Sequence, residues 1–139
     1  YHLEVERYVK DLEIEVNAID EIAVTYVLPA AYAHQKALAS SIDKVAKVLD
    51  GDDQSLLAPQ VDELRSIARS ISSLKSALAA LRETTAAALA LDIDAAATAF
   101  AYKVAPAIGA VRDVCDAIES SVDDALWPLP KYREMLFIV

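Results

Sequence analysis

The chain has 139 residues, a formal net charge of −9 and a single cysteine. A chain of this length forms one domain and can bury a core without a disulfide or a structural metal. The acidic balance disfavours binding to nucleic acid, which needs clustered Lys and Arg, and binding to an anionic membrane surface.

The composition favours long helices. Hydrophobic residues make up 55% of the chain, and there are only two glycines and five prolines. Glycine and proline interrupt helices, so their scarcity predicts an all-α fold. The longest nearly uncharged stretch, 84–102, is rich in alanine and contains Asp92 and Asp94, which argues against a membrane span. With no cysteine pair to form a disulfide, the composition fits a reducing, cytoplasmic location.

The first predicted helix covers residues 3–49. Its apolar stripe, with steps of four and three, consists of Val5, Val9, Leu12, Val16, Ile19, Ala23, Tyr26 and Ala30. A second run of Leu38, Ile42, Val45 and Leu49 is offset by one residue, and Pro29 lies at the offset. A proline inside a helix removes a hydrogen bond and clashes with the preceding turn, which predicts a kink at residues 27–29. Gly51, in the turn 50–53, is suited to a left-handed cap.

The second predicted helix covers residues 59–91, with Pro59 in its first turn. Its apolar stripe consists of Val61, Leu64, Ile67, Ile71, Leu74, Leu78, Leu81, Thr85 and Leu89. Either Asp92 or Asp94 can cap the helix that follows.

The third predicted helix covers residues 94–126 and contains Pro106, which predicts a second kink. Its stripe consists of Ala97, Phe100, Val104, Ile108, Val111, Cys115, Ile118 and Val122, which makes Cys115 a core thiol. Three long helices with short connections predict an antiparallel up-down-up bundle over residues 1–126.

Residues 127–139 form a different kind of segment. Pro128 and Pro130 flank Leu129, so the segment cannot begin as a helix, and it holds the only tryptophan of the chain. A tail this apolar is expected to dock on the bundle or on a partner surface. The predicted interface anchors are Trp127, Tyr132, Leu136 and Phe137.

The residues offer no recognisable catalytic site. Neither His2 nor His34 has a Glu three residues before it, which excludes the Glu-x-x-His pairs of a di-iron bundle. His34 could formally serve in a phosphotransfer bundle, but an ordinary surface histidine is the preferred interpretation. The acidic residues of 4–21 spread around the helix, as a solvated or salt-bridged face does. We therefore assign no catalytic, cofactor-binding or metal-binding residue, and the pattern indicates a helical interaction or structural module.

Two stretches resemble a known family. The first runs from Glu6-Arg7-Tyr8 through Lys10, Ile14-Glu15 and Asn17 to Val27-Leu28-Pro29-Ala30. It is similar to a helix that type III glutamine synthetases carry after their catalytic domain, with Ile-Leu-Pro-Ala in its middle. The tail resembles that family's closing pattern, Trp-Pro-x-Pro-x-Tyr followed by Leu-Leu-Phe, with Met135 in place of the first Leu. The chain thus resembles the C-terminal helical domain of a type III glutamine synthetase.

The resemblance implies a parent protein that makes glutamine from glutamate, ammonia and ATP, uses Mg²⁺ or Mn²⁺, and assembles into rings. Because the chemistry would belong to an upstream domain, this chain would be a non-catalytic assembly domain with no cofactor of its own. The chain has no initial methionine, since its only Met is Met135, and we expect a piece cut from a longer protein. Its partners would be the rest of the polypeptide and further copies in a homo-oligomer. The alternative is a free-standing helical adaptor without enzymatic activity, which would bind a partner helix.

Overall fold

A computed structural model describes residues 1–130 of the chain, and the predicted all-α class and three long helical segments are confirmed there. The first rod comprises α1 (His2–Ile22), the π-helical segment η1 (Ala23–Val27) and α2 (Leu28–Ala46). The second comprises the 3₁₀ helix η2 (Gly51–Leu57) and α3 (Ala58–Leu89). The third comprises α4 (Ile93–Ala99), the π-helical segment η3 (Phe100–Val104) and α5 (Ala105–Ser121), and a short 3₁₀ helix, η4 (Asp124–Leu126), follows. No described helix is long and apolar enough to cross a lipid bilayer.

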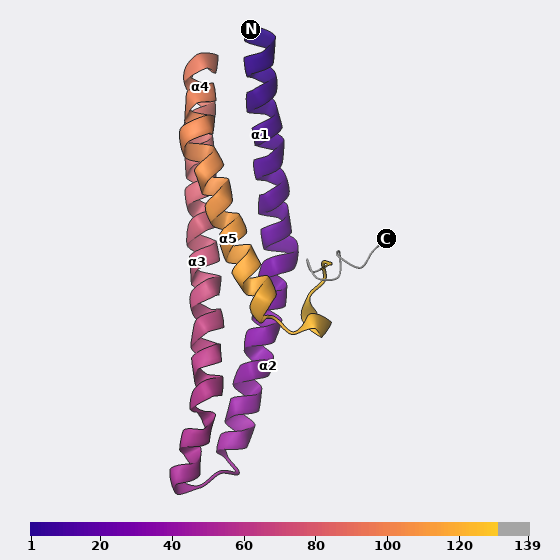
Figure 1. The fold of residues 1–139 in the computed structure, drawn as a ribbon, viewed down its shortest axis with the longest axis vertical. Coiled ribbons are helices and arrows are strands. Elements are labelled where there is room, and N and C mark those ends of the chain that lie inside the picture. Colours follow the sequence, from indigo (N-terminus) through magenta and orange to yellow (C-terminus); the bar gives the residue numbers. More distant parts are fainter. Residues whose placement is uncertain (131–139) are drawn as a thin grey trace.

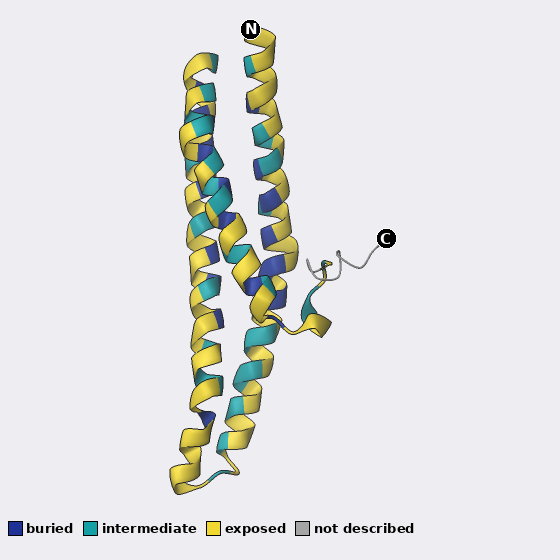
Figure 2. Cartoon of the chain, in the orientation of Figure 1, coloured by how far each residue is buried: buried dark blue, intermediate teal, exposed yellow. Residues whose placement is uncertain are grey.

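The three rods extend over different lengths of the molecule (Figure 1). The first rod runs the length of the molecule, α3 returns beside it, and α4 and α5 then lead back only to the junction of α1 and α2. The rod α3 therefore packs against α5 and against α2, while α1 packs against α4 and α5. Beyond the end of α5, no further α-helix among residues 1–130 packs on the hairpin of α2 and α3. Between residues 32 and 66, all of which the structure describes, only Leu57 is buried (Figure 2).

The apolar stripes predicted from the sequence supply most of the core, except for the run on α2, in which Leu38, Ile42 and Leu49 are half-buried and Val45 is exposed. On the third rod, Ala97 and Cys115 are half-buried and every other predicted position is fully buried. On α3 the stripe is buried from Ile67 to Thr85, but the prediction for Leu89 was wrong, because this side chain is exposed and Ala88 is buried instead. From Leu81 to Thr85 and from Thr85 to Leu89 the steps are both four residues, which rotates Leu89 off the buried face. A step of three from Thr85 reaches Ala88, which stays on that face.

The prediction for Tyr26 was also wrong: its side chain is 42% exposed, while Val27 is 1% exposed. The reason lies in η1, where the backbone N–H of Leu28 donates to the carbonyl of Ala23, five residues back. A π turn inserts one extra residue into the helix and so moves the buried position from 26 to 27. The one-residue offset seen in the sequence is thus taken up within η1.

Pro29 and Pro106 each follow a π-helical segment. In the third rod, the backbone N–H of Ala105, just before Pro106, donates to the carbonyl of Phe100, as Leu28 does before Pro29. A proline has no N–H to donate, and its ring clashes with the carbonyl four residues back, so a wider turn accommodates it. The bend predicted at each proline stays a prediction, while the structure records the π turn that such bends commonly accompany.

The helix ends agree with the predicted turn chemistry, with two corrections. Gly51 has the predicted left-handed φ of 56°, but α2 already ends at Ala46, so Gly51 opens η2 and does not cap that helix. The Asp92 carboxylate accepts a hydrogen bond of 3.0 Å from the Ala95 N–H, as predicted for a cap. The third helix ends at Ser121 and not at residue 126. Val122 adopts an extended backbone, and Asp123 then caps the short helix η4 through the Ala125 N–H.

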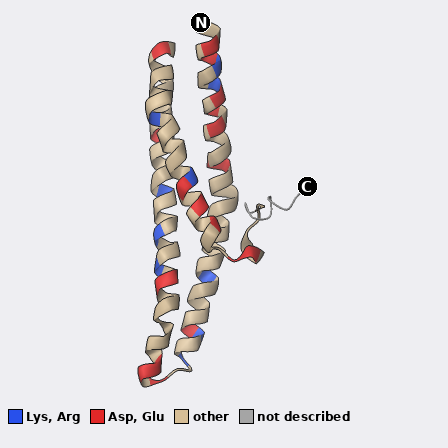
Figure 3. Cartoon of the chain, viewed as in Figure 1, with Lys and Arg blue, Asp and Glu red and all other residues tan. Residues whose placement is uncertain are grey.

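An ion pair links the first two rods. Arg82 on α3 donates two hydrogen bonds, of 2.6 and 2.7 Å, to the carboxylate of Asp20 on α1. These hydrogen bonds hold the pKa of Asp20 below its usual value of 3.8, although partial burial opposes the shift. Figure 3 shows the wider pattern, in which acidic residues gather on α1 and basic residues are spaced along α3.

We predict that Phe100→Ala lowers the free energy of unfolding by roughly 3–5 kcal/mol, because this fully buried ring fills the centre of the core. The matched control is Tyr102→Ala, in the same π-helical segment, whose ring is 79% exposed and whose loss should cost no more than about 0.5 kcal/mol. Urea denaturation followed by circular dichroism measures both. Equal losses in the two variants would contradict the buried position of Phe100.

We also predict that the pair of Asp20 and Arg82 stabilises the fold by about 0.5–1 kcal/mol at neutral pH, because Arg82 is largely exposed to solvent. The folded-state pKa of Asp20 is lowered, so the unfolded chain binds the proton first as the pH falls. The stabilisation is therefore present above pH 3.8 and is lost as the pH falls through the lowered pKa. A double-mutant cycle with Asp20→Asn and Arg82→Met, measured at about pH 6 and about pH 3, tests this. A coupling energy that stays constant between the two values would refute it.

Candidate functional site

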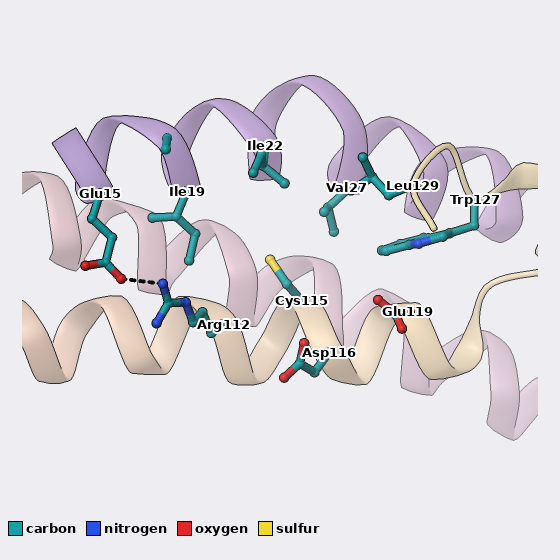
Figure 4. Close-up of a pocket in the computed structure, with 11 residues that line it drawn as sticks. Glu15, Ile19, Ile22, Val27, Arg112, Cys115, Asp116, Glu119, Trp127 and Leu129 are labelled. Atoms are coloured by element: carbon teal, nitrogen blue, oxygen red, sulfur yellow. Dashed lines mark hydrogen bonds and ion pairs between the residues drawn. The ribbon is translucent and has the colours of Figure 1, made fainter. Parts of the chain in front are cut away.

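A groove of about 320 Å³ lies between α1 and α5 (Figure 4). On α1, the groove is lined by the apolar side chains of Ala18, Ile19 and Ile22 and by the carboxylate of Glu15. The α5 wall is more polar and consists of Arg112, Cys115, Asp116 and Glu119, which the helical period places on one face. Val27, Trp127 and Leu129 lie at one end.

An ion pair closes the opposite end of the groove, where the guanidinium of Arg112 donates to the carboxylate of Glu15 (Figure 4). Both side chains are partly exposed, so the pair positions the two helices more than it stabilises them. The groove thus has a charged end and an aromatic end, with an apolar wall between them.

Cys115 is unsuited to nucleophilic chemistry. Burial, and to a smaller extent the charge of Asp116, raises the pKa of its thiol to about 11. Nucleophilic attack requires the thiolate, which is scarce at neutral pH when the pKa is this high. The side chain is half-buried and packs against the core, as its place in the apolar stripe predicts.

The acidic residues of α1 do not converge on one point. Within residues 1–130, no group of three or more His, Cys, Asp or Glu side chains is placed to hold a metal ion. Glu15 and Asp20 instead form ion pairs with α5 and α3. These two contacts fit the interpretation of the acidic residues as a solvated and salt-bridged face.

His34 lies at the edge of a second hollow of about 330 Å³, which Glu63, Ser66, Ser120 and Ser121 also line. Its Nδ1 accepts a hydrogen bond of 3.3 Å from the backbone N–H of Asp123. The histidine therefore links α2 to the turn after α5, which gives it a structural contact and fits the interpretation of an ordinary histidine.

Of the predicted anchors, the structure describes one. Trp127 is half-buried and packs against the core of the same chain, and its Nε1 is buried without a hydrogen-bond partner among the described residues. Tyr132, Leu136 and Phe137 lie outside the described residues. Sequence reasoning missed Ile22 as a groove residue, although the signal was present, because Ile22 is apolar but lies off the core stripe of α1.

Comparison with known proteins relates the chain to glutamine synthetases. Residues 1–46 match the family model described as the glutamine synthetase C-terminal domain. The chain is 28% identical over 138 residues to a glutamine synthetase of Bacteroides fragilis, an alignment that covers 97% of the chain and 19% of that protein. It is 32% identical over 142 residues to the type-3 glutamine synthetase of Dictyostelium discoideum, with 96% of the chain and 18% of that protein covered.

The chain therefore spans about a fifth of the length of these two relatives. The resemblance drawn from the first helix and the tail is confirmed, because the family model matches the first helix and both alignments cover nearly the whole chain. The chain is related to the C-terminal domain of glutamine synthetases, type III included.

Proposed function

We propose that this chain is the non-catalytic structural and assembly domain of a cytoplasmic, ATP-dependent glutamate–ammonia ligase that uses Mg²⁺ or Mn²⁺. The observation that carries the proposal is the alignment of nearly the whole chain with about a fifth of each of two glutamine synthetases. The reaction, its nucleotide and its metal would then belong to the remainder of the polypeptide.

The surface of the first rod supports an assembly role. It exposes large apolar side chains at 41–58% of their full area, namely Tyr8, Ile14, Val24, Tyr26 and Tyr32. Exposed apolar and aromatic side chains at this density favour contact with another protein surface. The rest of the polypeptide and neighbouring subunits of a homo-oligomer are the proposed partners.

The two-helix end of the molecule supports the same role. The hairpin of α2 and α3 extends beyond α5 with Leu57 as its single buried residue between 32 and 66. Two helices alone bury little apolar surface, so a hairpin of this kind gains stability by packing on a further surface. We propose that residues 1–126 form this supporting unit and that residues 127–139 are its docking tail, with Trp127, Tyr132, Leu136 and Phe137 as anchors.

We predict that the full-length protein that carries this chain takes up ammonia in a reaction that depends on ATP and glutamate. A matched form that stops just before Tyr1 should have a lower oligomeric mass, because it lacks the assembly surface. Coupled activity assays and light scattering measure the two quantities. No uptake by the full-length protein would overturn the ligase assignment, and an unchanged oligomeric mass in the shortened form would overturn the assembly role.

We predict that Trp127→Ala lowers the free energy of unfolding by about 3 kcal/mol, the low end of the range for truncation of a buried tryptophan, since this ring is only half-buried. The matched control is Trp127→Phe, which keeps an aromatic ring and removes the N–H that has no partner among residues 1–130. It should be at least as stable as the wild type, because an unsatisfied buried donor is costly. Chemical denaturation measures both, and a control variant as unstable as Trp127→Ala would show that the N–H does have a partner.

A further inference from the structure

We propose that residues 131–139 of the same chain occupy the groove between α1 and α5. This inference rests on the groove and on the sequence of the segment, and it does not depend on the activity of the parent protein. It assigns a binding surface to the tail, which would then contact both the first rod and the third.

The chain already enters the groove. Trp127 and Leu129 line its aromatic end beside Val27, and the segment in question follows directly after Pro130 (Figure 4). From Val27 back to Glu15, α1 and η1 rise by roughly 18 Å. Nine extended residues reach up to about 30 Å, and the same residues as a helix reach about 13 Å. The segment is thus long enough to follow the groove from its aromatic end towards the ion pair of Glu15 and Arg112.

The apolar chemistry of the two surfaces matches. The segment ends in five consecutive apolar residues, Met135 to Val139. The α1 wall of the groove offers Ala18, Ile19 and Ile22, and Ile22 is 40% exposed in the described structure. Apolar side chains placed on this wall would remove from water a surface that residues 1–130 leave uncovered.

The charges match as well. The segment begins with two basic residues, Lys131 and Arg133, and the adjacent α5 wall carries Asp116 and Glu119. The Asp116 carboxylate makes no ion pair within the described part of the chain. Basic residues at the start of the segment would therefore meet acidic residues at the end of the groove where the chain enters.

The covalent connection of residues 131–139 to the groove favours this segment over a separate protein as the occupant. Because Leu129 holds the segment at the groove, binding is intramolecular, and its effective concentration is in the millimolar range for a short linker. A free peptide of the same composition would have to overcome the full entropic cost of association.

Cys115 provides a direct test, because it lines the groove and is the only cysteine of this chain. In the full-length protein, deletion of residues 131–139 should speed the alkylation of Cys115 by maleimide roughly tenfold or more, as removal of a protecting segment does. Mass spectrometry of the Cys115 peptide gives the rate. Ile22→Glu, in the groove wall, should have the same effect as the deletion. Leu3→Glu, on α1 but outside the groove lining, should leave the rate unchanged, because this side chain is 80% exposed. An unchanged rate after deletion would overturn the proposal and indicate a different occupant.

Cross-linking identifies the chain that supplies the segment. Leu136→Cys should form a disulfide with Cys115 under mild oxidation, within one chain. The control is one variant that carries Cys115→Ala, Leu136→Cys and Val48→Cys, so that its second cysteine lies at the distant end of the hairpin. No disulfide should form between its two introduced cysteines. A disulfide that joins Cys115 of one chain to the introduced cysteine of another would overturn the assignment to the same chain. The absence of any disulfide to Cys115 would overturn occupation of the groove.

Discussion

The structure depends on how two prolines are accommodated inside helices that must keep one face buried. At Pro29 and at Pro106 the α-helical hydrogen bond cannot form, and the helix passes through a π turn that closes on the carbonyls of Ala23 and Phe100. The inserted residue rotates everything beyond it by about 100°. The core can remain continuous only if the apolar pattern shifts by one residue at the same place. Ala23 and Val27 are buried on either side of the first shift, as are Phe100 and Val104 at the second.

This constraint explains which parts of the fold could be predicted from the sequence. Most of the stripe of the third rod was predicted, and only Ala97 and Cys115 are half-buried. The predicted steps from Phe100 to Val104 and from Val104 to Ile108 are both four residues, which the wider turn of η3 keeps on the buried face. At η1 the one-residue shift was recognised but was assigned to the proline, so Tyr26 was predicted to be buried in place of Val27. Periodicity assumes a constant number of residues per turn, and a π turn violates that assumption. The proline marks where the helix is disturbed, but it does not show that a residue is inserted in the turn before it. The cap at Asp92 and the left-handed backbone of Gly51 could be predicted, because both depend on local backbone geometry.

The groove was less predictable than the fold, because it is formed by contacts between residues distant in sequence. Trp127 could be singled out by its residue type and by the prolines that follow, and it does lie at the groove. Arg112 could not, since its place at the groove depends on the way α5 crosses α1, whereas Ile22 gave one signal, an apolar side chain that lies off the core stripe. The ion pairs of the rods have the same character. Asp20 and Arg82 are 62 residues apart in the chain, and many other pairings of acidic and basic residues were equally compatible with the sequence.

The unequal lengths of the rods connect the fold with the proposed function. A third helix of full length would have covered the hairpin of α2 and α3. Instead α5 ends beside the junction of α1 and α2, where Val122 leaves the helix and Asp123 binds His34 on α2. The well-buried core therefore lies in the three-helix half, and the two-helix half extends from it with apolar side chains only partly covered. Burial of those side chains on a further protein surface would remove them from water, and the assembly role proposed above supplies such a surface.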